Sequence, residues 1–364
     1  MMNSSGSGQW RSRLHPRNIG AIYAWLGIIV IFWVIRPAYF PRLSTVDEVL
    51  NQNSVTGLIA LAIVLPLAAG VFDLSVGITA GMAGMVTAWI LANVTTNAVL
   101  AIAAGLAVAL AAGAINSLVV VVLGIDSFIG TLATGSIYTA ITISISADQP
   151  ISKNVDGAFS ANISLRNIHG ITVPVFYMLV IMLVVAFVLE GTVFGRRIYA
   201  IGYEREVARL SGVKVASSQA LSLMFCGLIA GIAGIAEAGI LGAGSPDVGN
   251  SFLIPAYAAA FLGATQFRHG RFNPWGTVAA VLLLGTGDVG LLISSAPDWT
   301  TDVFQGAVLI VAVGLTSHRS GSLGAVLDRI RGARGNSITK ALLPQADGDI
   351  RPPITVNAPD DSQG

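Results

Sequence analysis

Apolar and polar residues follow one another along this chain in long blocks. Ten apolar runs reach or approach the roughly 20 residues that a helix needs to cross the hydrocarbon core of a bilayer. They occupy residues 19–35, 54–72, 74–92, 98–123, 127–147, 171–189, 218–241, 252–267, 274–294 and 301–317. The pattern predicts an all-α fold, a polytopic membrane helical bundle of about ten transmembrane helices.

The basic residues predict how this bundle is oriented. Of the 20 Lys and Arg residues, only Arg36, Arg42, Lys153 and Arg166 lie outside four segments: the N-terminal tail, the loop 190–217, the turn 268–271 and the C-terminal tail. Positive charge next to a span resists translocation, so these four segments are expected in the cytoplasm. They precede the first run and follow the sixth, eighth and tenth, which agrees with ten crossings and two cytoplasmic termini.

Three parts of the chain follow from this pattern. Residues 1–18 form a cytoplasmic N-terminal tail, and residues 19–317 form the transmembrane domain with the cytoplasmic loop 190–217 inside it. Residues 318–364 form a cytoplasmic tail without apolar periodicity, which we expect to be disordered.

Composition excludes several classes of function. The chain is 54% hydrophobic and 11% charged, and its net charge of +1 gives no general attraction to nucleic acid. The single cysteine, Cys226, allows no intramolecular disulfide. The sequence has no phosphate-binding loop of the type G-x-x-x-x-G-K-[ST], and its four histidines are scattered through loops and tails. We therefore predict a protein that is no enzyme and holds neither metal nor cofactor, with energy supplied by a separate protein that docks on the loop 190–217.

Two acidic residues within the apolar sequence are candidates for a solute pathway, because charge at membrane depth usually serves a function. Asp73 lies between the second and third runs, and Glu237 lies deep in the seventh. Asp73 could contact solute, or it could cap the third span by accepting hydrogen bonds from free N–H groups. Glu237 could line the pathway or pair across helices.

Uncharged polar residues gather around the hairpin of the fourth and fifth runs. Hydroxyl and amide groups there could hydrogen-bond a neutral polar solute, or they could instead link neighbouring helices. The candidates are Asn116, Ser117, Thr131 and Thr134, with Ser136 nearby. Pro66 and Pro255 interrupt the second and eighth runs, and glycine pairs such as Gly77 with Gly81 indicate close helix packing.

Several motifs, in this order, carry a family resemblance: V-F-D-L-S-V-G-I at 71–78, A-I-N-S-L-V-V-V-V-L-G-I-D-S-F-I-G-T-L-A-T-G-S-I-Y at 114–138 and T-V-F-G-R-R-I-Y-A-I-G-Y-E-R-E-V-A-R-L-S-G-V-K-V at 192–215. Farther on, G-S-P-D-V-G at 244–249 precedes A-A-F-L-G-A-T-Q-F-R-H-G-R-F-N-P-W-G-T at 259–277. With these motifs the chain resembles the membrane permease subunits of bacterial ATP-binding-cassette importers for monosaccharides, the ribose-type group. Asp126 and Ser127 stand where the family usually has proline before Phe-Ile, which leaves the identity of the solute open.

The resemblance implies a permease subunit that forms the pathway for a sugar or similar small neutral polar solute in the lipid of the bacterial inner membrane. It implies three protein partners: a cytosolic ATPase that binds the ATP, an external solute-binding protein and a second permease copy. It places the ATPase contact at residues 196–215 within the loop 190–217, where a short helix over 203–211 is expected. The residues assigned to this coupling are Arg196, Gly202, Glu204, Arg205, Arg209, Ser211 and Gly212. The alternative is an ion-coupled secondary transporter, which the carboxyl groups of Asp73 and Glu237 and the broken second run would suit.

Overall fold

A computed structural model of the chain describes residues 20–266 and 270–319. The predicted N-terminal tail (1–18), Arg268 and the C-terminal tail beyond residue 319 lie outside the described residues. The described part is mostly helical. Within the described residues, seven helices are long and apolar enough to cross a membrane, and three shorter apolar helices occur at Tyr23–Ile35, Val248–Ala264 and Trp299–Gly314. Each of these ten segments overlaps one of the ten predicted apolar runs, with the largest difference at Leu43–Ala68, which begins well before residue 54.

The helices follow one another with short connections. In chain order they are α2 (Gly20–Ile35), α3 (Leu43–Ala68), α4 (Val76–Asn93), α5 (Ala98–Ser117), α6 (Ser127–Ser146), α7 (Ala158–Ile163), α8 (Val173–Ala186), α9 (Val193–Tyr203), α10 (Arg205–Leu210), α11 (Val215–Leu241), α12 (Val248–Ser251), α13 (Leu253–Ala264), α14 (Pro274–Ile293) and α15 (Trp299–Arg319). The π-helical turns Leu118–Val122 and Phe187–Gly191 extend α5 and α8. A hairpin of β1 (Asn167–Ile168) and β2 (Ile171–Thr172) pairs Asn167 with Thr172.

Polar side chains mark where several of these helices begin. Asn97, Asp126, Thr192 and Asn273 each accept hydrogen bonds from N–H groups in the first turn of α5, α6, α9 and α14. These N–H groups have no partner within the helix, so a side-chain acceptor there stabilises its start. Asp126, at the position where the family usually has proline, is therefore the cap of α6.

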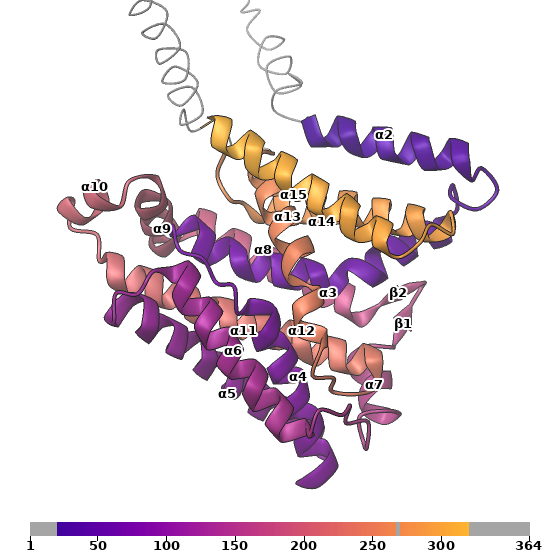
Figure 1. The fold of residues 1–364 in the computed structure, drawn as a ribbon, viewed down its shortest axis with the longest axis horizontal. Helices are drawn as coiled ribbons and strands as arrows, with labels where there is room; N and C mark the ends of the chain where they lie inside the picture. Colours follow the sequence, from indigo (N-terminus) through magenta and orange to yellow (C-terminus); the bar gives the residue numbers. More distant parts are fainter. Residues whose placement is uncertain (1–19, 267–269, 320–364) are drawn as a thin grey trace, which may run out of the picture. The chain divides into compact units, whose positions relative to one another are not determined.

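Helix α3 is the most buried of the seven long apolar helices. Helix α11 packs along α3, α4 and α5, whereas α14 packs against α3, α13 and α2 (Figure 1). Glycines permit the closest approaches: a Cβ on Gly234 would lie 1.8 Å from the carbonyl oxygen of Ala80, and one on Gly77 would lie 2.1 Å from that of Gly249. The close packing predicted from glycine pairs is confirmed for α4 against α11 and α12.

The polar segments contain more regular structure than predicted. Residues 36–53 lie between the first and second predicted apolar runs, yet α3 begins at Leu43. Residues 148–170, between the fifth and sixth predicted runs, include α7 and strand β1. The loop 190–217 contains two helices, and the helix expected over 203–211 is α10, since Tyr203 closes α9 and Glu204 is extended.

Connections predicted for the same membrane face contact one another. On the predicted external side, the side-chain amide of Asn51 donates to Gly170 O at 2.9 Å, and Ile151 pairs with Gly244 in a β-bridge. On the predicted cytoplasmic side, the hydroxyl of Tyr199 in α9 donates to Phe272 O at 2.7 Å. The Arg271 guanidinium also lies over the Tyr199 ring. The two groups of connections form separate sets of contacts.

Candidate functional site

The chain between α3 and α4, residues 69–75, is hereafter the connector. Helix α3 ends at Ala68, and Gly70 follows with φ +72°, a left-handed conformation that glycine adopts without strain. The connector has no regular backbone ladder, so side chains from other helices bind it. The Phe72 N–H donates to the Ser127 hydroxyl at 3.1 Å, and the Leu74 N–H donates to the Thr131 hydroxyl at 2.9 Å. The Tyr257 hydroxyl accepts from the Asp73 N–H at 3.2 Å and donates to the Asp73 carbonyl at 2.9 Å.

The side chain of Asp73 organises a buried polar network, the connector cluster, of Asp73, Ser75, Asn116, Thr134 and Tyr138. Its Oδ1 accepts from the backbone N–H of Ser75 (3.1 Å), the Ser75 hydroxyl (2.7 Å) and the Asn116 amide (3.1 Å). The Asn116 Oδ1 accepts in turn from Thr134 (2.6 Å) and Tyr138 (3.1 Å). Asp73 and Asn116 are each 1% exposed. Burying such groups is tolerated because each has hydrogen-bond partners.

The sequence left two roles open for Asp73: contact with a solute, or a cap at the start of the third span. Its carboxylate lies just before α4, where a cap was expected, but the N–H that it accepts from belongs to Ser75, the residue preceding the helix. Contact with a solute would require the connector cluster to open, since the carboxylate is buried in this conformation.

The other predicted pathway residues lie on neighbouring helices. Thr131 binds the connector backbone, as described above. The Ser117 hydroxyl donates to Gly113 O within α5 and to Ala220 O of α11, both at 2.8 Å. Glu237 is half-buried in α11 and borders a crevice of about 10 Å³ between α4 and α11, about enough for one water. It makes no hydrogen bond or ion pair with the residues that the structure describes, so it stands apart from the connector cluster.

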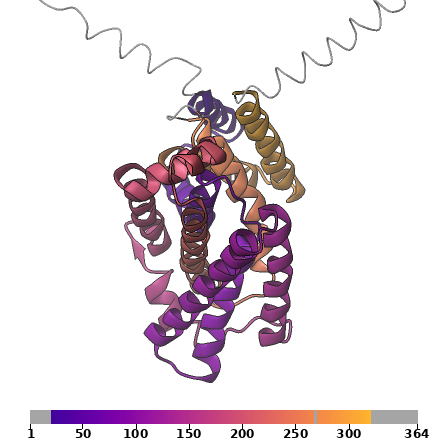
Figure 2. The same ribbon diagram turned by 90° about the vertical axis from the view of Figure 1, so that its left-hand side faces the viewer.

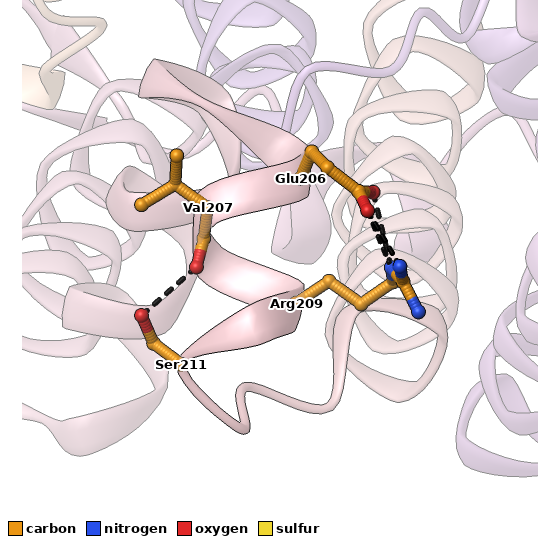
Figure 3. A network of polar contacts seen from close by, with 4 residues as sticks. All are labelled: Glu206, Val207, Arg209 and Ser211. Carbon is orange, nitrogen blue, oxygen red and sulfur yellow. Dashed lines mark hydrogen bonds and ion pairs between the residues drawn. The ribbon is translucent and has the colours of Figure 1, made fainter. Parts of the chain in front are cut away.

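Helices α9 and α10 form a second candidate site, hereafter the coupling surface. In α9, Ile198 and Ile201 are buried. In α10, the Arg209 Nε donates to Glu206 Oε2 at 3.0 Å, and the Ser211 hydroxyl donates to Val207 O at 2.9 Å (Figure 3). The hydrogen bond from Arg209 holds the pKa of Glu206 below its usual value.

The coupling surface also carries exposed apolar side chains. Tyr203, Val207 and Leu210 are 89%, 60% and 74% exposed. A groove of about 450 Å³ lies beside them, lined by Arg196, Tyr199, Ala200, Tyr203, Glu204, Val207, Ala208, Ser211, Val213 and Arg271. Figure 2 turns this end of the fold toward the viewer. Gly212, with φ +81°, ends α10 and directs the chain into α11.

The coupling surface touches the connector directly. A Cβ on Gly202 in α9 would lie 2.2 Å from the carbonyl oxygen of Ala68, so the two backbones are in contact. The same glycine lies against Gly70. The side-chain amide of Gln219 in α11 donates to Ala69 O at 3.1 Å. Helix α9 and the connector therefore meet through main-chain contacts.

Sequence reasoning missed several residues of these two sites. Tyr257 and Gln219 carry no signal in the sequence, because their partners lie 184 and 150 positions away. Glu206 could have been found, since Glu and Arg three positions apart on a helix commonly pair. Among the described residues, no group of His, Cys, Asp or Glu could hold a metal ion.

The long apolar helices define a multi-pass membrane protein. A family model described as branched-chain amino acid transport system / permease component matches residues 45–313. The chain belongs to this permease family. Its transport relatives identify it as a multi-pass protein of the bacterial inner membrane and as a transport protein rather than an enzyme.

Relatives with curated names refine this assignment. The chain is 33% identical to the D-allose transport system permease protein AlsC of Escherichia coli K12 over 291 residues, 79% of this chain and 88% of AlsC. It is 30% identical to the ribose import permease protein RbsC of the same strain, covering 80% of this chain and 91% of RbsC. It is 29% identical to the L-arabinose transport system permease protein AraH, covering 86% and 95%. No solved structure matches the chain significantly. The predicted resemblance to ribose-type permeases is confirmed.

Proposed function

We propose that the chain is the permease subunit of an ATP-binding-cassette importer and forms the membrane pathway for a sugar or similar small neutral polar solute. The observation that carries this proposal is the direct backbone contact between the coupling surface and the connector. It gives a cytosolic ATPase a mechanical route into the bundle. The relatives named for D-allose, ribose and L-arabinose supply the substrate class.

The coupling surface has the features of a docking site for the ATPase. The exposed side chains of Tyr203, Val207 and Leu210 offer apolar contacts, and the exposed Glu206–Arg209 ion pair adds charged groups beside them. Tyrosine and arginine are among the residue types that supply most of the binding energy at protein interfaces, which favours Tyr203 and Arg209 as the main contacts. Closure of the ATPase moves α9 and α10 as one body, and Gly202 passes this displacement to the connector.

The polar residues beside the connector are proposed to flank the solute pathway. Asp73, Asn116, Ser117, Thr131 and Thr134 carry hydroxyl, amide and carboxylate groups that can exchange their hydrogen bonds for those of a sugar when the connector moves. Glu237, at its crevice between α4 and α11, is placed at the outer part of the same route. Weak contacts suit a pathway, because a separate external binding protein supplies affinity.

Ten spans with both termini in the cytoplasm are part of the proposal. Support comes from the two separate sets of contacts among connections. Arg271 and Phe272 contact Tyr199, which favours one face for the segment after α13 and for the coupling surface. Single cysteines at Ser152 and at Lys214, in a Cys226→Ala background, test this arrangement with a membrane-impermeant thiol reagent. Intact cells should label at Ser152 alone, and labelling at Lys214 would reject the orientation.

A reconstitution experiment tests the function. The chain is placed in proteoliposomes with the ATPase and external binding protein that copurify with it from its native membrane, and uptake of radiolabelled ribose, allose and arabinose is measured. We expect uptake of at least one pentose or hexose that requires ATP and the binding protein and that survives collapse of proton and sodium gradients. A second permease copy should copurify with each complex, measured by mass photometry.

Control measurements distinguish the ATP-driven importer from an ion-coupled secondary transporter. Uptake driven by a proton or sodium gradient without ATP would support the ion-coupled alternative and reject the importer. A charge reversal at Glu206 together with Arg209 should lower ATP-driven uptake only slightly, because the pair is retained in the opposite order. Reversal of Arg209 alone should lower it more.

A further inference from the structure

An apolar cavity of about 430 Å³ opens between α2, α3 and α14. A single water needs only about 10–15 Å³ and polar partners. The threonine hydroxyls in this wall already have partners: Thr286 accepts from the Trp25 indole at 2.8 Å, and Thr45 donates to Tyr39 O at 3.2 Å. The cavity therefore suits an apolar occupant. Its lining comprises Trp25, Ile29, Trp33, Phe40, Pro41, Arg42, Leu43, Thr45, Val46, Val49, Leu50, Leu282 and Thr286.

A polar groove of about 570 Å³ adjoins this cavity and shares Arg42 and Thr45 with it. Two guanidinium groups, from Arg36 and Arg42, line the groove together with a single carboxylate, Glu48. Arg36 donates one N–H to Ser294 O at 3.2 Å, which leaves other donors of its five for a ligand. With two positive charges and one negative, the groove is complementary to an anion.

Arginine is the side chain best shaped to bind phosphate, because its planar group can donate two parallel hydrogen bonds. Arg42 is held in place by the Tyr39 ring, whose centroid is 5.2 Å from the guanidinium carbon. Both arginines follow the end of apolar helix α2 at Ile35, close to Trp33 and Tyr39. Aromatic residues at the end of an apolar helix are typical of the headgroup level of a bilayer.

We propose that the cavity and the groove together bind one anionic phospholipid, with an acyl chain between α2, α3 and α14 and the phosphate at Arg36 and Arg42. The two hollows together match both parts of an amphipathic ligand. The apolar cavity receives the acyl chain, and the adjoining groove with its two arginines receives the anionic headgroup. This proposal requires that the chain lies in a membrane. It does not depend on which solute is transported or on an ATPase partner.

Native mass spectrometry of the full chain tests this site. The protein is purified, stripped of lipid and titrated with phosphatidylglycerol or with phosphatidylcholine of the same acyl composition. We expect one phosphatidylglycerol to remain bound under conditions that remove phosphatidylcholine. Changing both Arg36→Gln and Arg42→Gln should weaken this binding by about fivefold per arginine, the scale of one cation near an anionic membrane surface. The matched control changes Lys153→Gln and Arg166→Gln, two basic residues outside both hollows, and should keep the lipid.

The apolar half has its own variant. Ile29→Phe fills the cavity and should lower retention of the lipid, whereas Val30→Phe, at a neighbouring α2 position that is 55% exposed and outside the cavity lining, should not. Equal retention of the two lipids by the unmodified protein would overturn the proposal. So would arginine variants that match their control. If Ile29→Phe instead abolishes self-association and leaves lipid binding unchanged, the cavity belongs to an interface with a second copy and the proposal fails. Should Ile29→Phe not fold, the arginine variants decide alone.

Discussion

Adding one methyl group at Gly202 should disturb both stability and coupling. In Gly202→Ala the new Cβ would lie 2.2 Å from the Ala68 carbonyl oxygen and 3.1 Å from its carbon, whereas ordinary contact begins at 3.4 Å. Neither atom belongs to a flexible side chain, so α9 and the end of α3 must separate by about 1 Å. Overpacking of this kind costs about 1–3 kcal/mol.

The same displacement weakens the connection between the coupling surface and the connector. If the whole cost falls on the coupled state, an energy of about 1–3 kcal/mol corresponds to a 5- to 150-fold loss of coupling. The assay measures solute uptake and ATP hydrolysis in the same proteoliposomes, and the expected result is a lower ratio of solute imported to ATP hydrolysed. Thermal unfolding in detergent reports the accompanying loss of stability.

Gly306→Ala serves as the matched control. Gly306 lies within α15 with nothing near the position of an added Cβ, so alanine there should leave coupling unchanged and favour the helix. A Gly202→Ala protein with the unmodified ratio of uptake to hydrolysis would refute the proposed transmission through this contact. A lower unfolding temperature with an unchanged ratio would leave Gly202 as a packing residue only.

Three further outcomes follow from the described contacts. Asp73→Ala removes the acceptor of three hydrogen bonds and should lower the free energy of unfolding by roughly 1–3 kcal/mol, the scale of a buried group left unpaired. An unchanged denaturant midpoint would contradict this. Tyr257→Phe leaves the backbone of Asp73 without its hydroxyl partner and should cost about 1–2 kcal/mol in the same measurement. Tyr199→Phe removes a part-buried hydroxyl that donates to Phe272 O and serves as the comparison, with a smaller expected cost. Because Arg209 lowers the pKa of Glu206 below 4.5 in the folded chain, the pair stabilises α10 above that pH and is lost as the pH falls through the lowered value. Amide exchange in α10, corrected for its intrinsic pH dependence, should be constant from neutral pH to about pH 5 and accelerate in more acid, whereas Glu206→Gln should show no such step.

The sequence predicted the membrane helices well because their signal is local. A long apolar run has few alternatives to a helix where backbone groups cannot reach water. The start of α3 was missed for the same reason: Asp47, Glu48 and Asn51 are polar, so no apolar pattern marks the part of the helix before residue 54. The Asn51 side chain instead bonds Gly170 and Thr172, partners that only the fold brings near.

The candidate site was predictable in part. Asp73, Asn116 and Thr134 were grouped from their residue types, and the structure joins them in one network. Their hydrogen-bond directions, the role of Ser75 and the contribution of Tyr257 depend on how four separate helices meet at the connector. No spacing along the chain encodes that meeting.

The main-chain contacts made by glycines have a consequence for how such a bundle can diversify. Where α4 meets α11 and α12 through Gly77, Gly234 and Gly249, carbonyl oxygens and Cα atoms form the interior, and there is no side chain to exchange. Mutation cannot alter the chemistry of those contacts without pushing the helices apart. Descendants that acquire a new solute must therefore do so with residues on helix faces outside these contacts. Solute specificity can then change while the packing of the helices stays the same.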